Sequence, residues 1–208
     1  MNQTAICNLA LLRLGNSQPI ASIDDPSAPA RACKAVWDSC IQTMLRERPW
    51  PFAVRQVQLA VVGEGLVSDW LYSYRYPSGY INVHRLIEVQ DDGDTAVIYT
   101  TQETSLKESQ PFELGSDASG RLIHTDCSNA YAFGTVNITD TNLFDPLFTS
   151  ALAWFIASEI CMTVTKSREL INMTRSMYYE TVSTAFAASA NEPKPREDRD
   201  ADMIAARE

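Results

Sequence analysis

Hydrophobic and polar positions follow a helical period at both ends of the chain and a period of two in its middle. The first helical stretch covers residues 4–14, with Gly15 placed for a left-handed cap and Pro19 soon after it. One face of this helix is expected to carry its apolar residues, which are Ala5, Ile6, Leu9 and Leu12.

A second amphipathic helix is predicted after the turn-rich link Asp24-Asp25-Pro26-Ser27. Pro49 and Pro51 end it, because each proline removes a backbone donor and restricts the residue before it. The apolar residues recur at three- and four-residue steps, namely Cys33, Val36, Trp37, Cys40, Ile41 and Met44. This repeat indicates one buried stripe.

The period changes over about residues 53 to 142. An alternating run places four aromatic rings on one face of a predicted strand: Trp70, Tyr72, Tyr74 and Tyr76. Further strands are predicted at residues 81–89, 95–101, 122–124 and 131–136. Asp91-Asp92-Gly93-Asp94 and Gly63-Glu64-Gly65 are interpreted as hairpin turns, and residues 103–120 as polar and turn-prone.

Helical period returns with Asp145 as a candidate N-cap and Pro146 at the first helical position. The apolar surface that follows is broad, which predicts a central helix packed on more than one side. It comprises Leu147, Phe148, Ala151, Leu152, Phe155, Ile156 and Ile160. A break at Thr165-Lys166-Ser167 starts the last helix, which carries Leu170, Ile171, Thr174, Met177, Tyr178, Val182, Ala185 and Phe186.

Residues 191–208 have too little apolar surface to fold alone and are predicted to form a flexible C-terminal arm. The fold class expected is α+β. An antiparallel bundle of about four helices (residues 1–52 and 143–190) would carry a β-rich insertion (residues 53–142) between helices 2 and 3. The arm holds four candidate interface residues, which are Arg196, Arg199, Met203 and Ile204. We expect it to dock on a neighbouring molecule; the alternative is a solvated tail.

The 208 residues have a formal net charge of -9, which argues against a clamp that holds nucleic acid through a basic surplus. An acidic wall repels phosphates, so the same charge is compatible with surrounding a path along which DNA slides. The sequence shows no secretion signal and no run of about 18 apolar residues that would span a bilayer.

No residue pattern nominates a catalytic, cofactor-binding or metal site. The only histidines, His84 and His124, lie in strand-like segments, and the five cysteines form no C-x-x-C pair. We expect buried thiols in a protein made in a reducing cytoplasm. The glycines form no phosphate-binding loop. Binding without catalytic turnover is therefore predicted.

Two features leave more than one interpretation open. Glu159 lies within the broad apolar surface of the third helix, where it is either one carboxylate of a glycosidase with no identified partner or, as we favour, part of an ion pair at a helix boundary or between subunits. The row from Trp70 to Tyr76 either covers the core of the β-rich region, which we favour, or stacks sugars or bases or anchors a protein interface.

Five segments occur in a set order along residues 1–190. They are Ala10-Leu11-Leu12-Arg13-Leu14-Gly15, Leu45-Arg46-Glu47-Arg48-Pro49-Trp50-Pro51-Phe52-Ala53, Trp70 through Pro77, Ile123-His124-Thr125-Asp126, and Asp145-Pro146-Leu147-Phe148-Thr149-Ser150-Ala151-Leu152. Together they resemble bacteriophage head–tail connector proteins, the tail tubular protein A-like family of short-tail adaptors. The chain departs from that pattern after Pro77, where the family has an acidic residue, a cysteine and an apolar residue and this chain has Ser78-Gly79-Tyr80-Ile81.

The resemblance implies a structural virion protein, made in the host bacterial cytoplasm, whose copies form a dodecameric ring beneath the portal protein. The ring would join the portal to the tail tube or nozzle protein. DNA would pass through its channel without sequence-specific binding, and no membrane would be involved. The family has no catalytic residues, cofactors or metals to transfer. The alternatives are a virion-associated enzyme that degrades polysaccharide or cell wall, and a host-derived helical scaffold module.

Overall fold

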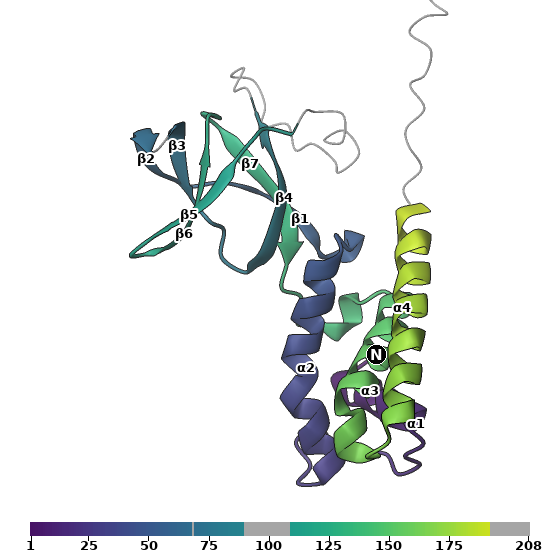
Figure 1. Ribbon diagram of the computed structural model, residues 1–208. Helices are drawn as coiled ribbons and strands as arrows, with labels where there is room; N and C mark the ends of the chain where they lie inside the picture. Colours follow the sequence, from purple (N-terminus) through teal and green to yellow (C-terminus); the bar gives the residue numbers. More distant parts are fainter. Residues whose placement is uncertain (68, 90–108, 192–208) are drawn as a thin grey trace, which may run out of the picture.

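The computed structural model describes residues 1–67, 69–89 and 109–191 of the chain (Figure 1). The described residues form helices α1 (Gln3–Arg13), α2 (Ala28–Glu47), α3 (Pro146–Val164) and α4 (Arg168–Asn191). They also form strands β1 (Val54–Gln58), β2 (Val61–Val67), β3 (Trp70–Arg75), β4 (Tyr80–Glu88), β5 (Glu113–Asp117), β6 (Gly120–Thr125) and β7 (Ala130–Val136). Two short 3₁₀ turns, η1 (Pro51–Ala53) and η3 (Thr141–Leu143), lie where the sheets meet the helices.

This architecture corrects the fold class expected from the sequence. The helices lie toward the two ends of the chain, with α1 and α2 before the strands and α3 and α4 after them. The middle of the chain is two antiparallel sheets of seven strands with a hydrophobic cluster of their own, and not an insertion carried by an antiparallel four-helix bundle. Helical periodicity located the helices, but it could not show that the strands bury enough apolar surface to build a separate core.

Helix boundaries follow the capping residues predicted from the sequence. The Asp145 side chain accepts hydrogen bonds from the backbone N–H groups of Leu147 and Phe148, which are orphan donors at the start of α3. Gly15 adopts φ +80° after α1, a left-handed conformation that glycine tolerates without a Cβ clash.

The predicted apolar face of α1 is wrong in one respect. Leu12 is 63% exposed, and the buried residues of this helix are Ile6, Cys7, Ala10 and Leu11. The predicted stripe of α2 is confirmed, because all six of its residues but Val36 are buried and Val36 packs against the core.

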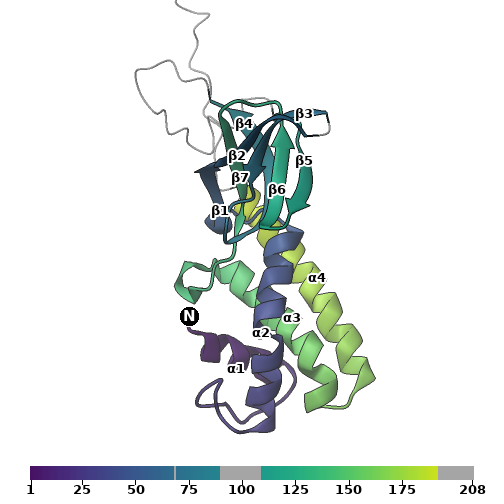
Figure 2. The same cartoon turned by 90° about the vertical axis from the view of Figure 1, so that its left-hand side faces the viewer.

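Helix α3 is the centre of the helical part, as its broad apolar surface predicted. Helices α1, α2 and α4 all pack against it (Figure 2). Its length and composition alone would allow it to cross a membrane, but 56% of its most apolar window is buried in the protein.

The strands form two antiparallel sheets, ordered β1-β7-β4 and β2-β3-β6-β5. Strand β1 leads into β2 through Leu59 and Ala60, and Gln110 forms a bridge to Leu86 of β4 just before β5. The two sheets enclose one hydrophobic cluster, which includes Leu59, Tyr74, Tyr76, Val83, Leu86, Ile123, Cys127, Ala130 and Ala132.

Two turn predictions are wrong and one falls outside the described residues. Gly63-Glu64-Gly65 lies inside β2, which is paired with β3 on both sides of a register shift. Residues 113–117, predicted to be turn-prone, form β5. The predicted hairpin at residues 91–94 and the strand after it lie outside the described part of the chain.

An aromatic cluster joins the helices to the segments that lead into and out of the sheets. We call it the junction cluster; its members are Trp50, Phe52, Phe144, Phe148 and Phe186. Trp50 is 1% exposed, and its indole N–H donates to the Met44 carbonyl oxygen at 2.8 Å. Its ring lies edge-on to the Phe148 ring, with 4.9 Å between centroids, a favourable geometry for aromatic pairs.

The junction cluster sets where the sheets stand relative to the helices. One connection runs from α2 through Trp50 and Phe52 into β1, and the other runs from β7 through Phe144 into α3. Arg46 adds a polar contact, because its guanidinium donates to the Ile81 carbonyl oxygen of β4 at 3.0 Å. The sheets therefore project beyond one end of α2, offset to one side of the helices (Figure 1).

Trp50→Ala is expected to lower the free energy of unfolding by about 3–5 kcal/mol, because it removes a fully buried aromatic side chain and leaves a cavity in the junction cluster. Leu12→Ala serves as a control and should change that free energy by less than about 0.5 kcal/mol, since Leu12 is largely exposed. Urea denaturation of both variants measures the two changes. Equal losses would contradict the assignment of the core.

Candidate interaction surface

The aromatic row of β3 lies mostly inside the protein. Tyr74 is 1% exposed, and its hydroxyl donates to the Cys127 carbonyl oxygen at 2.7 Å. Tyr76 also belongs to the cluster between the sheets, and Tyr72 packs against that cluster. This burial agrees with the interpretation that the row covers the core of the β-rich region, and it leaves little of Tyr74 and Tyr76 for a partner to touch.

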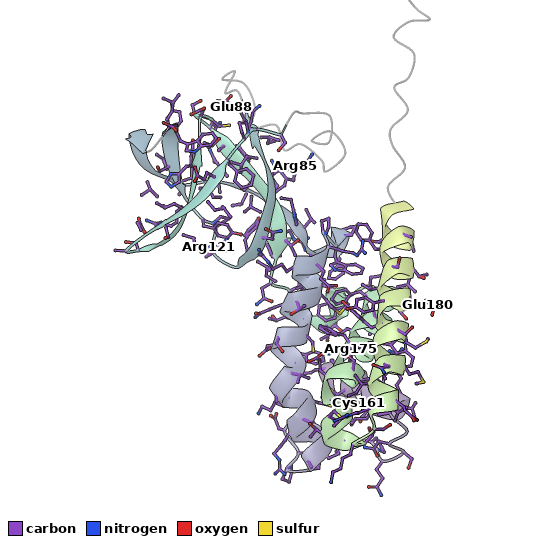
Figure 3. The ribbon with its side chains drawn as sticks, in the orientation of Figure 1. Arg85, Glu88, Arg121, Cys161, Arg175 and Glu180 are labelled. Atoms are coloured by element: carbon purple, nitrogen blue, oxygen red, sulfur yellow. The ribbon has the colours of Figure 1, made fainter. Side chains whose placement is uncertain are left out.

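Tyr76 has a polar group without a partner. Its hydroxyl oxygen is buried and makes no hydrogen bond to any described residue. The guanidinium of Arg121, on β6, lies 3.8 Å from the centroid of the Tyr76 ring (Figure 3). A cation over a ring face is attracted by the ring quadrupole. The Tyr76 ring is thus stabilised by the contact with the Arg121 cation, whereas its hydroxyl contributes no hydrogen bond.

Trp70 is half-buried at the start of β3, as is Tyr72, whereas Tyr74 and Tyr76 are buried. Its indole N–H donates to the Glu113 carboxylate at 3.0 Å, which joins β3 to β5. The neighbouring Leu71 is 49% exposed. Among the candidates in the row, Trp70 and Tyr72 are therefore the ones with surface left for contact with another molecule.

The face of β3 and β6 that points away from the enclosed cluster carries a polar pair. Ser73 and His124 are direct cross-strand neighbours, and the Ser73 hydroxyl lies 2.9 Å from Nδ1 of His124. The His124 ring lies against β5 at Gly115, where a Cβ atom would come within 2.3 Å of Nε2. A glycine at this point of β5 is what allows the histidine to lie flat on the sheet.

A bidentate ion pair lies at the other end of this face. The Arg75 guanidinium donates to both carboxylate oxygens of Asp117, at 2.8 and 3.0 Å. This bond to Arg75, together with smaller contributions from the Ser119 and Gly120 backbone N–H groups, lowers the pKa of Asp117 from 3.8 to about 2. Bidentate pairing of this kind fixes geometry as well as charge.

The remaining titratable candidates are buried or interact with other residues of the same chain. Nε2 of His84 lies 2.7 Å from the Thr135 hydroxyl, and burial lowers the pKa of His84. All five cysteines are buried and free, as predicted: Cys7, Cys33, Cys40, Cys127 and Cys161. Burial, followed by the nearby charge of Glu159, raises the pKa of Cys40 to about 12. Within the described residues no group of three His, Cys, Asp or Glu side chains could hold a metal ion.

Glu159 pairs with Arg175 of α4 across the α3–α4 contact, at 3.9 Å (Figure 3). The pair lies within one chain and inside both helices, whereas the sequence suggested a helix boundary or a contact between subunits. Both side chains are substantially exposed, so screening by water leaves this pair little net energy.

Large apolar side chains are exposed on both parts of the molecule. On the sheets they are Val61, Val62, Leu71 and Leu114. On the helices they are Leu12, Leu147, Met162, Met173 and Tyr179, with Leu143 just before α3. The arm candidates Arg196, Arg199, Met203 and Ile204 lie outside the described residues.

Sequence patterns did not reveal several contacts that shape this surface. Arg121 and Asp117 sit in or beside a segment that was interpreted as turns, so their partners Tyr76 and Arg75 could not be assigned. Both faces of β6 mix polar and apolar residues, so alternation along this strand gave no signal for these contacts.

Comparison with known proteins adds no identity to this geometry. Neither a protein-family model nor a curated protein matches the chain.

Tyr74→Phe and Tyr76→Phe are expected to act differently, although each removes one hydroxyl from the same aromatic row. Tyr74→Phe should lower the free energy of unfolding by about 1–2 kcal/mol, since it leaves the Cys127 carbonyl oxygen unpaired. Tyr76→Phe should leave that free energy unchanged or raise it, because the hydroxyl it removes has no partner. Chemical denaturation of the matched pair tests this order, and a larger loss for Tyr76→Phe would contradict the hydrogen-bond assignment.

The Asp117 carboxyl is expected to titrate at a pH of about 2 in the folded protein. Because its folded pKa lies below its unfolded value, its contribution to stability is present above the unfolded pKa and disappears as the pH falls through about 2. NMR titration of the side-chain carboxyl carbon measures the value. In Arg75→Gln the same carboxyl should titrate closer to 3.8; an unchanged value would exclude Arg75 as the cause.

Proposed function

We propose that this chain is a structural adaptor of a bacteriophage particle, whose copies form a ring between the portal protein and the tail around the path of the DNA. The observation that carries the proposal is the junction cluster, which ties two separately packed parts together at two connections. Two of the five segments that resemble head–tail connectors supply three of its five rings. Two parts joined in this way would hold their binding surfaces at fixed positions relative to one another.

The distribution of charge supports the same role. Residues 54–136 contain eleven acidic and five basic side chains, whereas residues 1–53 and 137–191 together contain nine acidic and eight basic ones. The helical part is therefore close to neutral, and the negative charge concentrates in the β-rich part. A negative surface repels phosphates, which favours passage of DNA without adhesion.

Charge also bears on how the ring would form. Like-charged copies repel one another in solution, so the free chain is expected to remain a monomer and to assemble where a portal presents adjacent binding sites. A closed ring needs head-to-tail contacts, in which two different surfaces of each copy meet.

Negative-stain electron microscopy tests the proposal directly. The chain mixed with the portal protein of its virus is expected to add a ring of density to one face of the portal, while the chain alone should show no rings at low concentration. Portal particles without added density would overturn the adaptor role. A second assay measures release of sugars from capsule or peptidoglycan; turnover that is lost in Glu159→Gln would favour the enzyme instead.

A further inference from the structure

Helix α4 is held to the rest of the chain by a narrow stripe. Its buried positions are Thr174, Tyr178, Val182, Ala185 and Ser189. Two of these five are polar, and Leu170 and Ile171 also pack against the core near the start of this 24-residue helix. By contrast, ten residues of α3 are buried. α4 is thus attached along one face, chiefly to α3.

A few side-chain contacts supplement this stripe, and all of them could also be made by a second copy. The Tyr178 ring stacks on Phe155 of α3 with 4.7 Å between centroids, and its hydroxyl donates to Glu47 at 2.6 Å. Arg48 lies over the Phe186 ring at 4.7 Å. Each contact joins α4 to α2, α3 or the segment between α2 and β1, and none lies within α4 itself.

The turn between α3 and α4 is short and strained. Lys166 has φ 56°, and it is the one non-glycine residue in the described part of the chain with positive φ. A residue with a Cβ adopts this left-handed conformation at a cost, because the Cβ approaches the following carbonyl oxygen. The strain is released if residues 165–167 extend and α4 leaves α3. Short hinges under strain favour the exchange of an element between copies.

We propose that α4 is an exchangeable element, and that α4 of one copy takes the place of α4 on α3 of a second copy. The occupant follows from the structure: α4 is a helix already shown to fit that surface of α3, so a second copy fits it equally well. The exchange rebuilds the Tyr178, Arg175 and Phe186 contacts between copies and removes the strain at Lys166. As a contact between ring subunits this inference rests on the proposed function, but the exchange itself is tested without a portal.

Exchange is unfavourable for dilute copies, since association loses translational and rotational freedom. Copies brought together on a template have a high effective concentration, which offsets that loss. The exchanged form is therefore expected in concentrated or templated protein, and the closed monomer in dilute solution.

Cross-linking between two single variants detects the exchange. Glu159→Cys and Arg175→Cys place thiols on α3 and α4 at the two ends of an observed ion pair. The variants are mixed at high concentration, warmed to open α4, cooled, and treated with a short bismaleimide. The five native cysteines are buried and should react slowly. A cross-linked heterodimer is expected after this cycle, and none in an unwarmed dilute mixture.

Three controls make the outcome decisive. The double variant should cross-link within one chain when dilute, which shows that the reagent spans the distance. The unsubstituted protein should give no cross-linked dimer. Lys166→Gly, added to both single variants, should lower the heterodimer fraction about fivefold, because glycine removes roughly 1 kcal/mol of strain from the closed form.

Dimers without this cross-link, no dimers at all, or an undiminished yield with Lys166→Gly would overturn the proposal. Any of these outcomes leaves the adaptor proposal standing, whereas a portal without added density overturns the adaptor proposal alone.

Discussion

The packing of Trp50 against Phe148 is the contact on which the arrangement of the two parts depends. Trp50 lies between the end of α2 and β1, and Phe148 lies in the first turn of α3, so this pair brings both connections together. The indole N–H is satisfied by the Met44 carbonyl oxygen, which lets a large polar-tipped ring be fully buried. Pro49 and Pro51 stop α2 at this place, so the chain turns toward the sheets where the cluster can hold it.

The helical and β-rich parts bury their apolar residues in different ways. In the helical part, α3 provides a broad apolar surface that accepts three helices. In the β-rich part, Tyr74 and Ile123 are neighbours on adjacent strands and both face the second sheet. Polar pairs such as Arg75–Asp117 fill the opposite face. Helix α4 packs along one face, chiefly on α3, whereas α3 contacts helices on several sides.

Local signals in the sequence were sufficient for the helices but not for the whole fold. Asp145 and Pro146 specify the start of α3 by capping chemistry that involves only neighbouring residues. Strand β5 was missed, because Glu113-Leu114-Gly115-Ser116-Asp117 has little preference for strands and becomes one only through pairing with β6. Leu12 was misplaced, since the choice of the buried face of α1 is made by α3, where Arg13 binds the Ser150 carbonyl oxygen. The Tyr76–Arg121 and Trp70–Glu113 contacts likewise depend on strand order, which no local pattern encodes.

The central claim is that the junction cluster holds the helices and the sheets as one rigid body. Residual dipolar couplings of backbone amides in weakly aligned protein measure this directly, because they report the orientation of every element relative to a common frame. The account predicts that a single alignment tensor fits the couplings of α2, α3, β3 and β7 together. Two different tensors, one for the helices and one for the strands, would contradict it.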